Sequence, residues 1–226
     1  CEFRRVCGGS RARALAVLPY PLAKVVNAGC RPEVPAPISA QEDLYVRARI
    51  ASMDDDGQRA LITQRIETGT KSAPLALVTE MRTFIPLQKK NSGDGNKAAK
   101  VRASVPADAL EISFSRIPAN AGLDFAKLTG DFNPIHWIAA YARASGFRSC
   151  ILHGFSTLAR AIEAVNRARL VGDPWRMRVV DARFTRPLVL PARVGVYVGH
   201  EGGLWVGDAP GGGAYLAGEF QAEGLA

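Results

Sequence analysis

Residues 125–136 read Phe-Ala-Lys-Leu-Thr-Gly-Asp-Phe-Asn-Pro-Ile-His, and a second short stretch, Ile-Leu-His-Gly, follows at 151–154. Asp131 and His136 stand five residues apart, so a carboxylate and an imidazole can hold one water or one hydroxyl group between them. Gly154 opens an apolar stretch that predicts a helix, and the first amides of a helix lack intrahelical acceptors and lie at the positive end of its dipole. Together these residues predict a site that moves a proton beside a polarised carbonyl group.

The two stretches resemble the signature of the MaoC-like dehydratases, the (R)-specific enoyl-CoA hydratases of the hot-dog superfamily. The resemblance covers residues 120–170 well and the strand-rich tail to residue 222 loosely. It implies an α+β fold, a double hot-dog in which an antiparallel sheet wraps around a central helix in each half. It also implies reversible hydration of trans-2-enoyl thioesters, with no cofactor and no metal. One departure is Ile138, which stands where the family often has an acidic residue or Asn.

The resemblance also implies roles for single residues. Asp131 and His136 correspond to the catalytic dyad, Asn133 to a residue that supports it, and Gly154 to the backbone donor to the thioester oxygen. Four neighbouring residues are expected to contact the substrate: Phe132, His153, Phe155 and Ser156. For His153 and Ser156 the alternative is local packing or a backbone hydrogen bond, and for Asp131 it is capping of the turn into the next helix.

The sequence predicts two unequal halves. We expect a degenerate, shortened N-terminal hot-dog at 1–87, a flexible basic linker at 88–102 and a catalytic C-terminal hot-dog at 103–226. Residues 3–10 align faintly with 125–132 as a repeat, but no histidine occurs before His136. The first half therefore cannot use the same dyad.

Hydrophobic periodicity predicts the elements of both halves. Strands are expected at 44–50, 59–67, 74–84, 110–114, 178–184, 193–198, 204–206 and 214–220. A helix is expected at 137–144, with Tyr141 in the core, and a longer one from Gly154 with a buried face made by Phe155, Leu158, Ile162 and Val165, widened by Ala159, Ala161 and Ala164.

Composition excludes several functions. The net charge is +8, but much of the excess lies in the segment 88–102, where no aromatic residues alternate with the lysines as in a nucleic-acid platform. No apolar stretch approaches the roughly 20 residues that span a bilayer. The four cysteines show no paired spacing, which favours a reduced, cytoplasmic compartment, and the three histidines do not combine with them as metal ligands.

Some questions stay open at this level. A thioesterase on the same fold and a non-catalytic acyl-thioester-binding subunit are the competing functions. The thioester carrier is CoA or an acyl carrier protein, and the protein is a monomer or a homodimer. The acyl length and the division of acid and base roles between Asp131 and His136 are also open.

Overall fold

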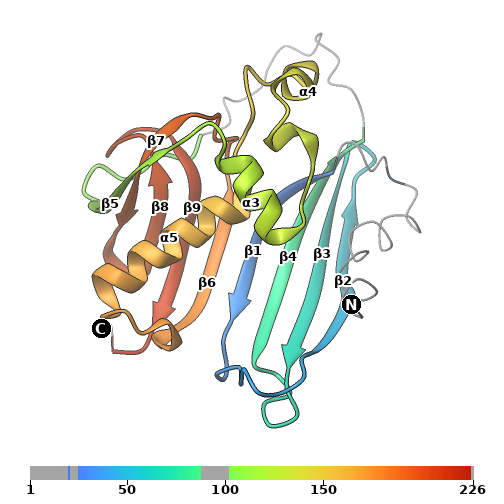
Figure 1. Cartoon of the computed structure of the whole chain (residues 1–226), viewed down its shortest axis with the longest axis vertical. Coiled ribbons are helices and arrows are strands. Elements are labelled where there is room, and N and C mark those ends of the chain that lie inside the picture. The colour runs from blue at the N-terminus through green and yellow to red at the C-terminus, as the bar shows by residue number, and fades with distance from the viewer. Residues whose placement is uncertain (1–19, 21–24, 88–101, 225–226) are drawn as a thin grey trace. The chain divides into compact units, whose positions relative to one another are not determined.

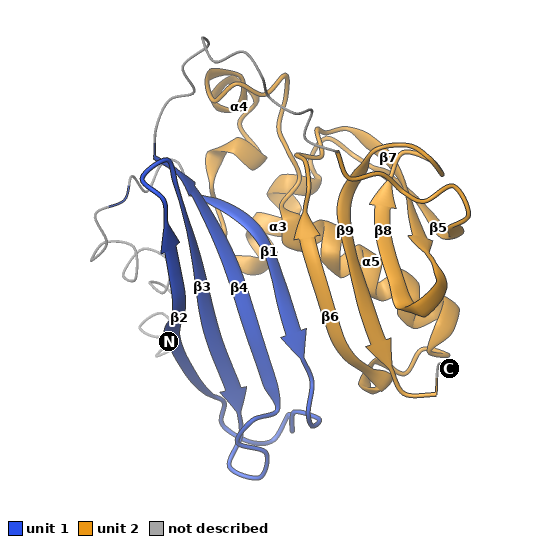
Figure 2. Cartoon of the chain, turned by 180° about the vertical axis from the view of Figure 1, so that it is seen from behind, with its two compact units in different colours: residues 1–99 blue, residues 100–226 orange. Residues whose placement is uncertain are grey.

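The structure is a computed structural model that describes residues 20, 25–87 and 102–224 (Figure 1). By its internal contacts the chain divides into two compact units, Cys1–Ala99 and Lys100–Ala226 (Figure 2). The expected repeat at 3–10 and nearly all of the expected linker at 88–102 lie outside the described residues. The assignment of the first half as a degenerate hot-dog therefore stays a prediction.

The described part of unit 1 is an antiparallel sheet with the strand order β2-β3-β4-β1 (Figure 2). The strands are β1 (Val26–Glu33), β2 (Tyr45–Asp55), β3 (Arg59–Gly69) and β4 (Leu77–Pro86). Three of these were predicted, and β1 was missed. Its apolar alternation is broken by Gly29, where the pairing with β4 shifts register, and by Pro32.

Unit 2 combines an antiparallel sheet with a long helix. The sheet has the order β6-β9-β8-β7-β5. Its strands are β5 (Leu110–Ile117), β6 (Met177–Phe184), β7 (Ala192–Val198), β8 (Gly203–Gly207) and β9 (Ala214–Ala222). Helix α5 (Gly154–Arg169) runs across this sheet and contacts β5, β6, β8 and β9 (Figure 1). This arrangement confirms the expected α+β hot-dog fold, with a curved sheet packed around a central helix.

The sequence placed the buried face of α5 nearly correctly. Leu158 and Val165 are 4% and 0% exposed, whereas Phe155 and Ile162 are half-buried at the margin of that face. Ala159 is exposed, so it does not widen the buried face as expected, because it lies on the opposite side of the helix from Ala161. None of the helices in the described ranges is long and apolar enough to cross a membrane.

The segment before α5 differs from the prediction. A helix that the sequence did not reveal, α3 (Ala121–Thr129), leads into the motif, and a 3-10 turn, η2 (Pro134–His136), follows it. The next helix, α4 (Ala139–Ala144), is short and buries only Ala142. Tyr141 is 48% exposed, so its expected core position was wrong.

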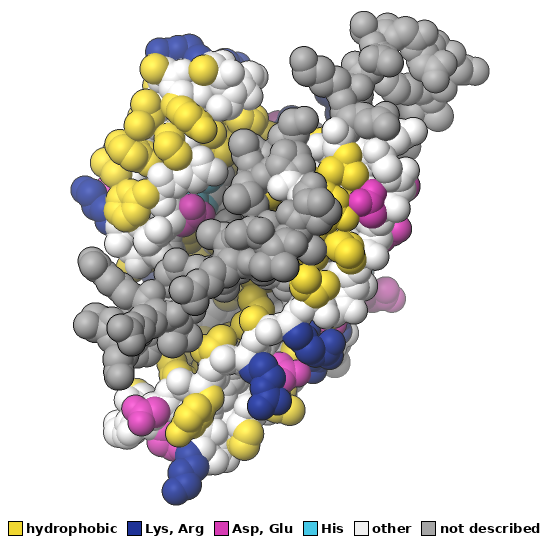
Figure 3. All heavy atoms as spheres, turned by 90° about the vertical axis from the view of Figure 1, so that its right-hand side faces the viewer, with side chains coloured by type: hydrophobic (Ala, Val, Ile, Leu, Met, Phe, Trp, Pro, Cys, Tyr) yellow, Lys and Arg dark blue, Asp and Glu magenta, His cyan; other side chains and the backbone are white. Residues whose placement is uncertain are grey.

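Large hydrophobic side chains remain exposed around the motif. The exposed hydrophobic residues of the motif region are Leu128, Phe132, Trp137, Ile138 and Tyr141. Hydrophobic side chains also gather on the face of the molecule shown in Figure 3. A short helix with one buried residue cannot cover those of the motif region, which is why an apolar sequence alone misled the core assignment.

Candidate active site

The motif at 125–136 forms a compact loop between α3 and α4. Gly130 ends α3 in the left-handed conformation (φ 76°), which glycine adopts without a steric penalty and which turns the chain into Asp131. Asn133 then caps the 3-10 turn, since its side-chain oxygen accepts a hydrogen bond from the Ile135 amide at 3.3 Å. Through this bond Asn133 stabilises the loop that carries Asp131 and His136, and the bond does not involve either of their side chains.

Two hydrogen bonds to the main chain of Ile151 hold His136 and its neighbour Ile135 in place. Its Nδ1 lies 2.8 Å from the Ile151 carbonyl oxygen, and the Ile151 amide donates to the Ile135 carbonyl oxygen at 3.2 Å. Because a carbonyl oxygen only accepts, Nδ1 of His136 carries a proton. In the neutral ring Nε2 is then an unprotonated acceptor, which is the state a proton-accepting imidazole requires.

His153 is buried and contacts both Asp131 and His136. Its side chain is 3% exposed, and its Nε2 is 3.0 Å from the main-chain oxygen of Asp131 and 4.0 Å from the carboxylate oxygen Oδ2. The imidazole stacks on that of His136, with 3.5 Å between ring centroids and 25° between the planes. The side chain of Asp131, in contrast, is 37% exposed, so a ligand can reach its carboxylate.

Gly154 begins α5, and its amide points from the end of the helix at which the dipole is positive. The amides of Ser156 and Thr157 bond to the His153 carbonyl oxygen at 3.0 and 3.2 Å, which closes the first turn. A methyl group on Gly154 would lie 2.9 Å from carbons of the Phe184 ring. Glycine therefore lets the start of α5 approach β6 this closely.

The remaining predicted residues fall into two groups. Phe132 is 51% exposed and Phe155 is half-buried, with its ring packed edge-on against Phe184 at 5.8 Å between centroids. Ser156 is only 5% exposed, which favours the local role that its amide already has. The structure thus clusters Asp131, His136 and His153, and it places Gly154 next to His153 in the chain.

Among the described residues, one group of possible metal ligands occurs, and it is this same cluster. One ligand atom each from Asp131, His136 and His153 lies within 4.8 Å of the others. The two imidazoles are stacked, so their in-plane lone pairs run side by side instead of converging on one ion. The Nε2 of His153 is also committed to a carbonyl oxygen. This geometry fits proton transfer better than metal binding.

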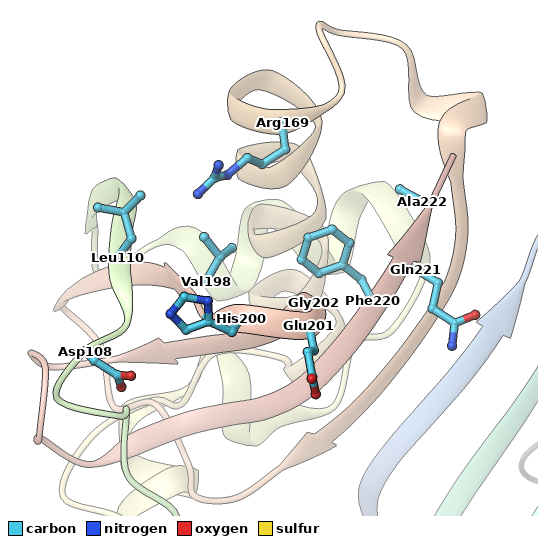
Figure 4. Close-up of a pocket in the computed structure, with 11 residues that line it drawn as sticks. Asp108, Leu110, Arg169, Val198, His200, Glu201, Gly202, Phe220, Gln221 and Ala222 are labelled. Atoms are coloured by element: carbon cyan, nitrogen blue, oxygen red, sulfur yellow. The ribbon is translucent and has the colours of Figure 1, made fainter. Parts of the chain in front are cut away.

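A pocket of about 630 Å³ lies at the other end of α5, away from this cluster (Figure 4). Arg169, the last residue of the helix, extends toward the part of the pocket that Val198 and His200 line (Figure 4). A helix of 16 residues is about 24 Å long, so this pocket is not the dyad site. None of the predicted site residues lines it.

Sequence reasoning missed two residues that shape the site. Ile151 supplies only main-chain atoms to His136, and any residue type could do so, so no sequence signal marks it. Gly122 in α3 packs on the main chain of His136, because a methyl group there would lie 1.9 Å from the His136 carbonyl oxygen. A glycine inside a helix is costly and is the one weak signal for such a contact.

The chain is similar in sequence and fold to known proteins. A family model described as "MaoC like domain" matches residues 98–208. The chain is 31% identical over 166 residues to the enoyl-CoA hydratase ChsH3 of Mycobacterium tuberculosis, covering 72% of this chain and 56% of ChsH3. It is 29% identical over 170 residues to 3-hydroxyacyl-thioester dehydratase X of the same organism, covering 75% of this chain and 57% of that protein. The chain thus spans about half the length of the curated relatives it matches.

Solved structures show the same fold. A MaoC-like dehydratase from Phytophthora capsici superposes with a TM-score of 0.74 at 21% identity, over 92% of this chain and 75% of the other. A Mycobacterium tuberculosis protein described as a double hot-dog matches 97% of this chain and 89% of its own length, with a TM-score of 0.55 at 15% identity. The motif residues, the helix-on-sheet architecture and these similarities lead to one conclusion: the chain belongs to the MaoC-like dehydratase and (R)-hydratase family of the hot-dog superfamily.

Proposed function

We propose that this chain is an (R)-specific enoyl-thioester hydratase, which in reverse dehydrates (3R)-3-hydroxyacyl thioesters. One observation carries the proposal. The half-exposed carboxylate of Asp131 and a ring nitrogen of His136 lie within 4.8 Å of each other, and His153, the third member of the cluster, directly precedes the start of α5. Two hydrogen bonds of about 2.8 Å can span such a distance through a single water.

The hydration step follows from these groups. Asp131 and His136 orient a water, and one of them takes a proton as the water oxygen forms its bond to C3 of the enoyl group. The electrons of the C2=C3 bond move toward the thioester oxygen, where the Gly154 amide stabilises the negative charge. The enolate then collapses as C2 receives the proton, so that H and OH have been added across the double bond.

The dyad residues contribute differently. His136 has its Nδ1–H committed to the Ile151 carbonyl, so in the neutral ring its Nε2 can accept a proton without a change of tautomer. Asp131, whose side chain is 37% exposed, carries the charge that stabilises a protonated imidazole beside it. We therefore assign proton acceptance to His136 and water orientation to Asp131.

The experiment follows loss of the conjugated enoyl-thioester absorbance with enoyl-CoAs of increasing length. Asp131→Asn and His136→Ala are expected to reduce kcat by about 10²–10⁴-fold, which is the range for a positioned acid or base. His200→Gln is the matched control, because this histidine is exposed in a 3-10 turn beyond β7. Unchanged turnover in both dyad variants would refute the assignment.

The same assay separates the competing functions. A thioesterase would release free thiol, which a thiol reagent detects, without prior loss of the double bond. A non-catalytic acyl-binding subunit would bind the enoyl-CoA in calorimetry and leave it unchanged. Repeating the assay with an enoyl group on acyl carrier protein compares the two carriers.

A further inference from the structure

Within the described part of the chain, His153 is a buried ionisable side chain that contacts both members of the dyad. His153 is the N-cap residue of α5, and its side chain contacts the motif loop at Asp131. Its side chain is 3% exposed, so the solvent and a substrate have little access to it. The groups that it contacts are therefore the best guide to its role.

Its first contact is with Asp131. The 3.0 Å bond joins Nε2 to the main-chain oxygen, so Nε2 is the donor and must carry a proton. That carbonyl belongs to a loop residue whose amide donates a long bond, 3.4 Å, to the Thr129 hydroxyl. The buried imidazole thus anchors the peptide from which the reactive carboxylate projects.

Its second contact is with His136. The rings stack at 3.5 Å between centroids, which leaves the His136 ring no room to tilt in that direction. The ring of Phe125, from α3, lies 4.9 Å from the His153 ring and packs against it at 47°. His153 is itself held in place, so it can serve as a rigid support for the His136 ring.

We propose that His153 is a positioning residue that holds both dyad members, through its Nε2–H bond to the Asp131 carbonyl and its stacking on the His136 imidazole. The inference rests on the proposed hydratase function. It does not make His153 a substrate contact, which was the expectation from sequence. A displacement of about 1 Å in a reacting group commonly costs about 10²-fold in rate.

Three substitutions separate the two contacts. His153→Gln keeps an N–H at the position of Nε2 but removes the aromatic ring. His153→Phe keeps an aromatic ring but removes the donor, and His153→Asn removes the ring and is too short to reach the Asp131 carbonyl. His200→Gln is again the control at an exposed histidine.

We expect kcat to fall by about 10–100-fold in His153→Phe and His153→Asn, and by less than about tenfold in His153→Gln, with KM within about twofold of wild type throughout. A rise in KM at unchanged kcat would instead make His153 a substrate contact and overturn the proposal. An equal loss of kcat in all three variants, together with a lower Tm, would mean that His153 only packs the core, and would also overturn the proposal.

A measurement without turnover keeps this test separate from that of the hydratase function. The chain has only three histidines, so imidazole ¹⁵N NMR can resolve each ring. The structure requires Nε2–H on His153 and Nδ1–H on His136. If the wild-type protein hydrates no enoyl thioester, the proposed function fails, while these protonation states still test the support. An unprotonated Nε2 on His153 would overturn the support itself.

Discussion

Gly154→Ala tests whether the start of α5 must approach β6 as closely as the structure shows. The new methyl group would meet three carbons of the Phe184 ring at 2.9 Å. Carbon atoms in ordinary contact are about 3.5–4.0 Å apart, so the helix start or the ring must move by roughly 0.6–1.1 Å. Gly154 does not have a left-handed φ, so the substitution adds no backbone strain of that kind.

The ring has little freedom to absorb this displacement. Phe184 packs against Phe155 from the same helix turn, so moving the ring disturbs a second contact with α5. If the helix start moves instead, a hydrogen bond of about 2.9 Å from the Gly154 amide to the substrate lengthens to about 3.5 Å or more and is lost. Losing one such donor costs about 2.7–4 kcal/mol, or about 10²–10³ in kcat.

The assay is kcat for enoyl-CoA hydration in a double-mutant cycle. Gly154→Ala should lose about 10²–10³-fold, and adding Phe184→Ala should recover much of that loss by making room for the methyl group. Phe184→Ala alone is the control, and urea unfolding reports the cost in stability, expected at about 1–3 kcal/mol for the overpacked single variant. Wild-type turnover in Gly154→Ala would refute the need for this close approach of α5 to β6. A double variant as inactive as Gly154→Ala would refute the steric cause.

Three further outcomes are expected. Gly122→Ala should lower kcat or stability more than Gly154→Ala does, because its methyl group would lie 1.9 Å from the main-chain oxygen of His136, which cannot rotate away; thermal unfolding and kcat measure it. Burial, and then a hydrogen bond to a carboxylate, raise the pKa of Tyr197 to about 12. The contribution of Tyr197 to the free energy of unfolding should therefore be fully present below about pH 10 and should fall by about 1.4 kcal/mol per pH unit between about pH 10 and 12. Urea unfolding at increasing pH measures this fall, and Tyr197→Phe should lack it. Leu158→Ala, at 4% exposure, should cost about 2–5 kcal/mol, whereas Ala159→Ser on the exposed side should stay within about 0.5 kcal/mol, both by urea unfolding.

Elements with a regular period could be read from the sequence, and elements shaped by backbone contacts could not. The strands of unit 2 show clear apolar repeats and were predicted close to their observed bounds, and helix α5 was predicted to start near Gly154, where it starts. Helix α3 was missed because its second residue, Gly122, is a poor helix former. That glycine is instead selected by its close contact with the His136 main chain, which is a tertiary effect.

The candidate site divides in the same way. Asp131, His136 and Gly154 could be identified from residue type and spacing, because the proposed chemistry needs a carboxylate, an imidazole and a first-turn amide. The tautomer of His136 could not, because its acceptor is a main-chain carbonyl that any residue can supply. The burial of His153 could not either, since it depends on how the motif loop folds back on the start of α5.

The two motif stretches act as one structural unit, which explains why they occur together. Residues 150–152 bond to residues 188–190 through the Leu152 amide and the Cys150 carbonyl, and Ile151 bonds to Ile135 and His136. The same short segment continues directly into α5. The orientation of the His136 imidazole and the position of the Gly154 amide therefore share one support. Helix α4 lies in the segment between the two stretches, so changes in its sequence should leave that support intact. The number of residues from Ile151 to Gly154, in contrast, should not change. This spacing sets how the proposed base and the proposed oxyanion donor face a substrate.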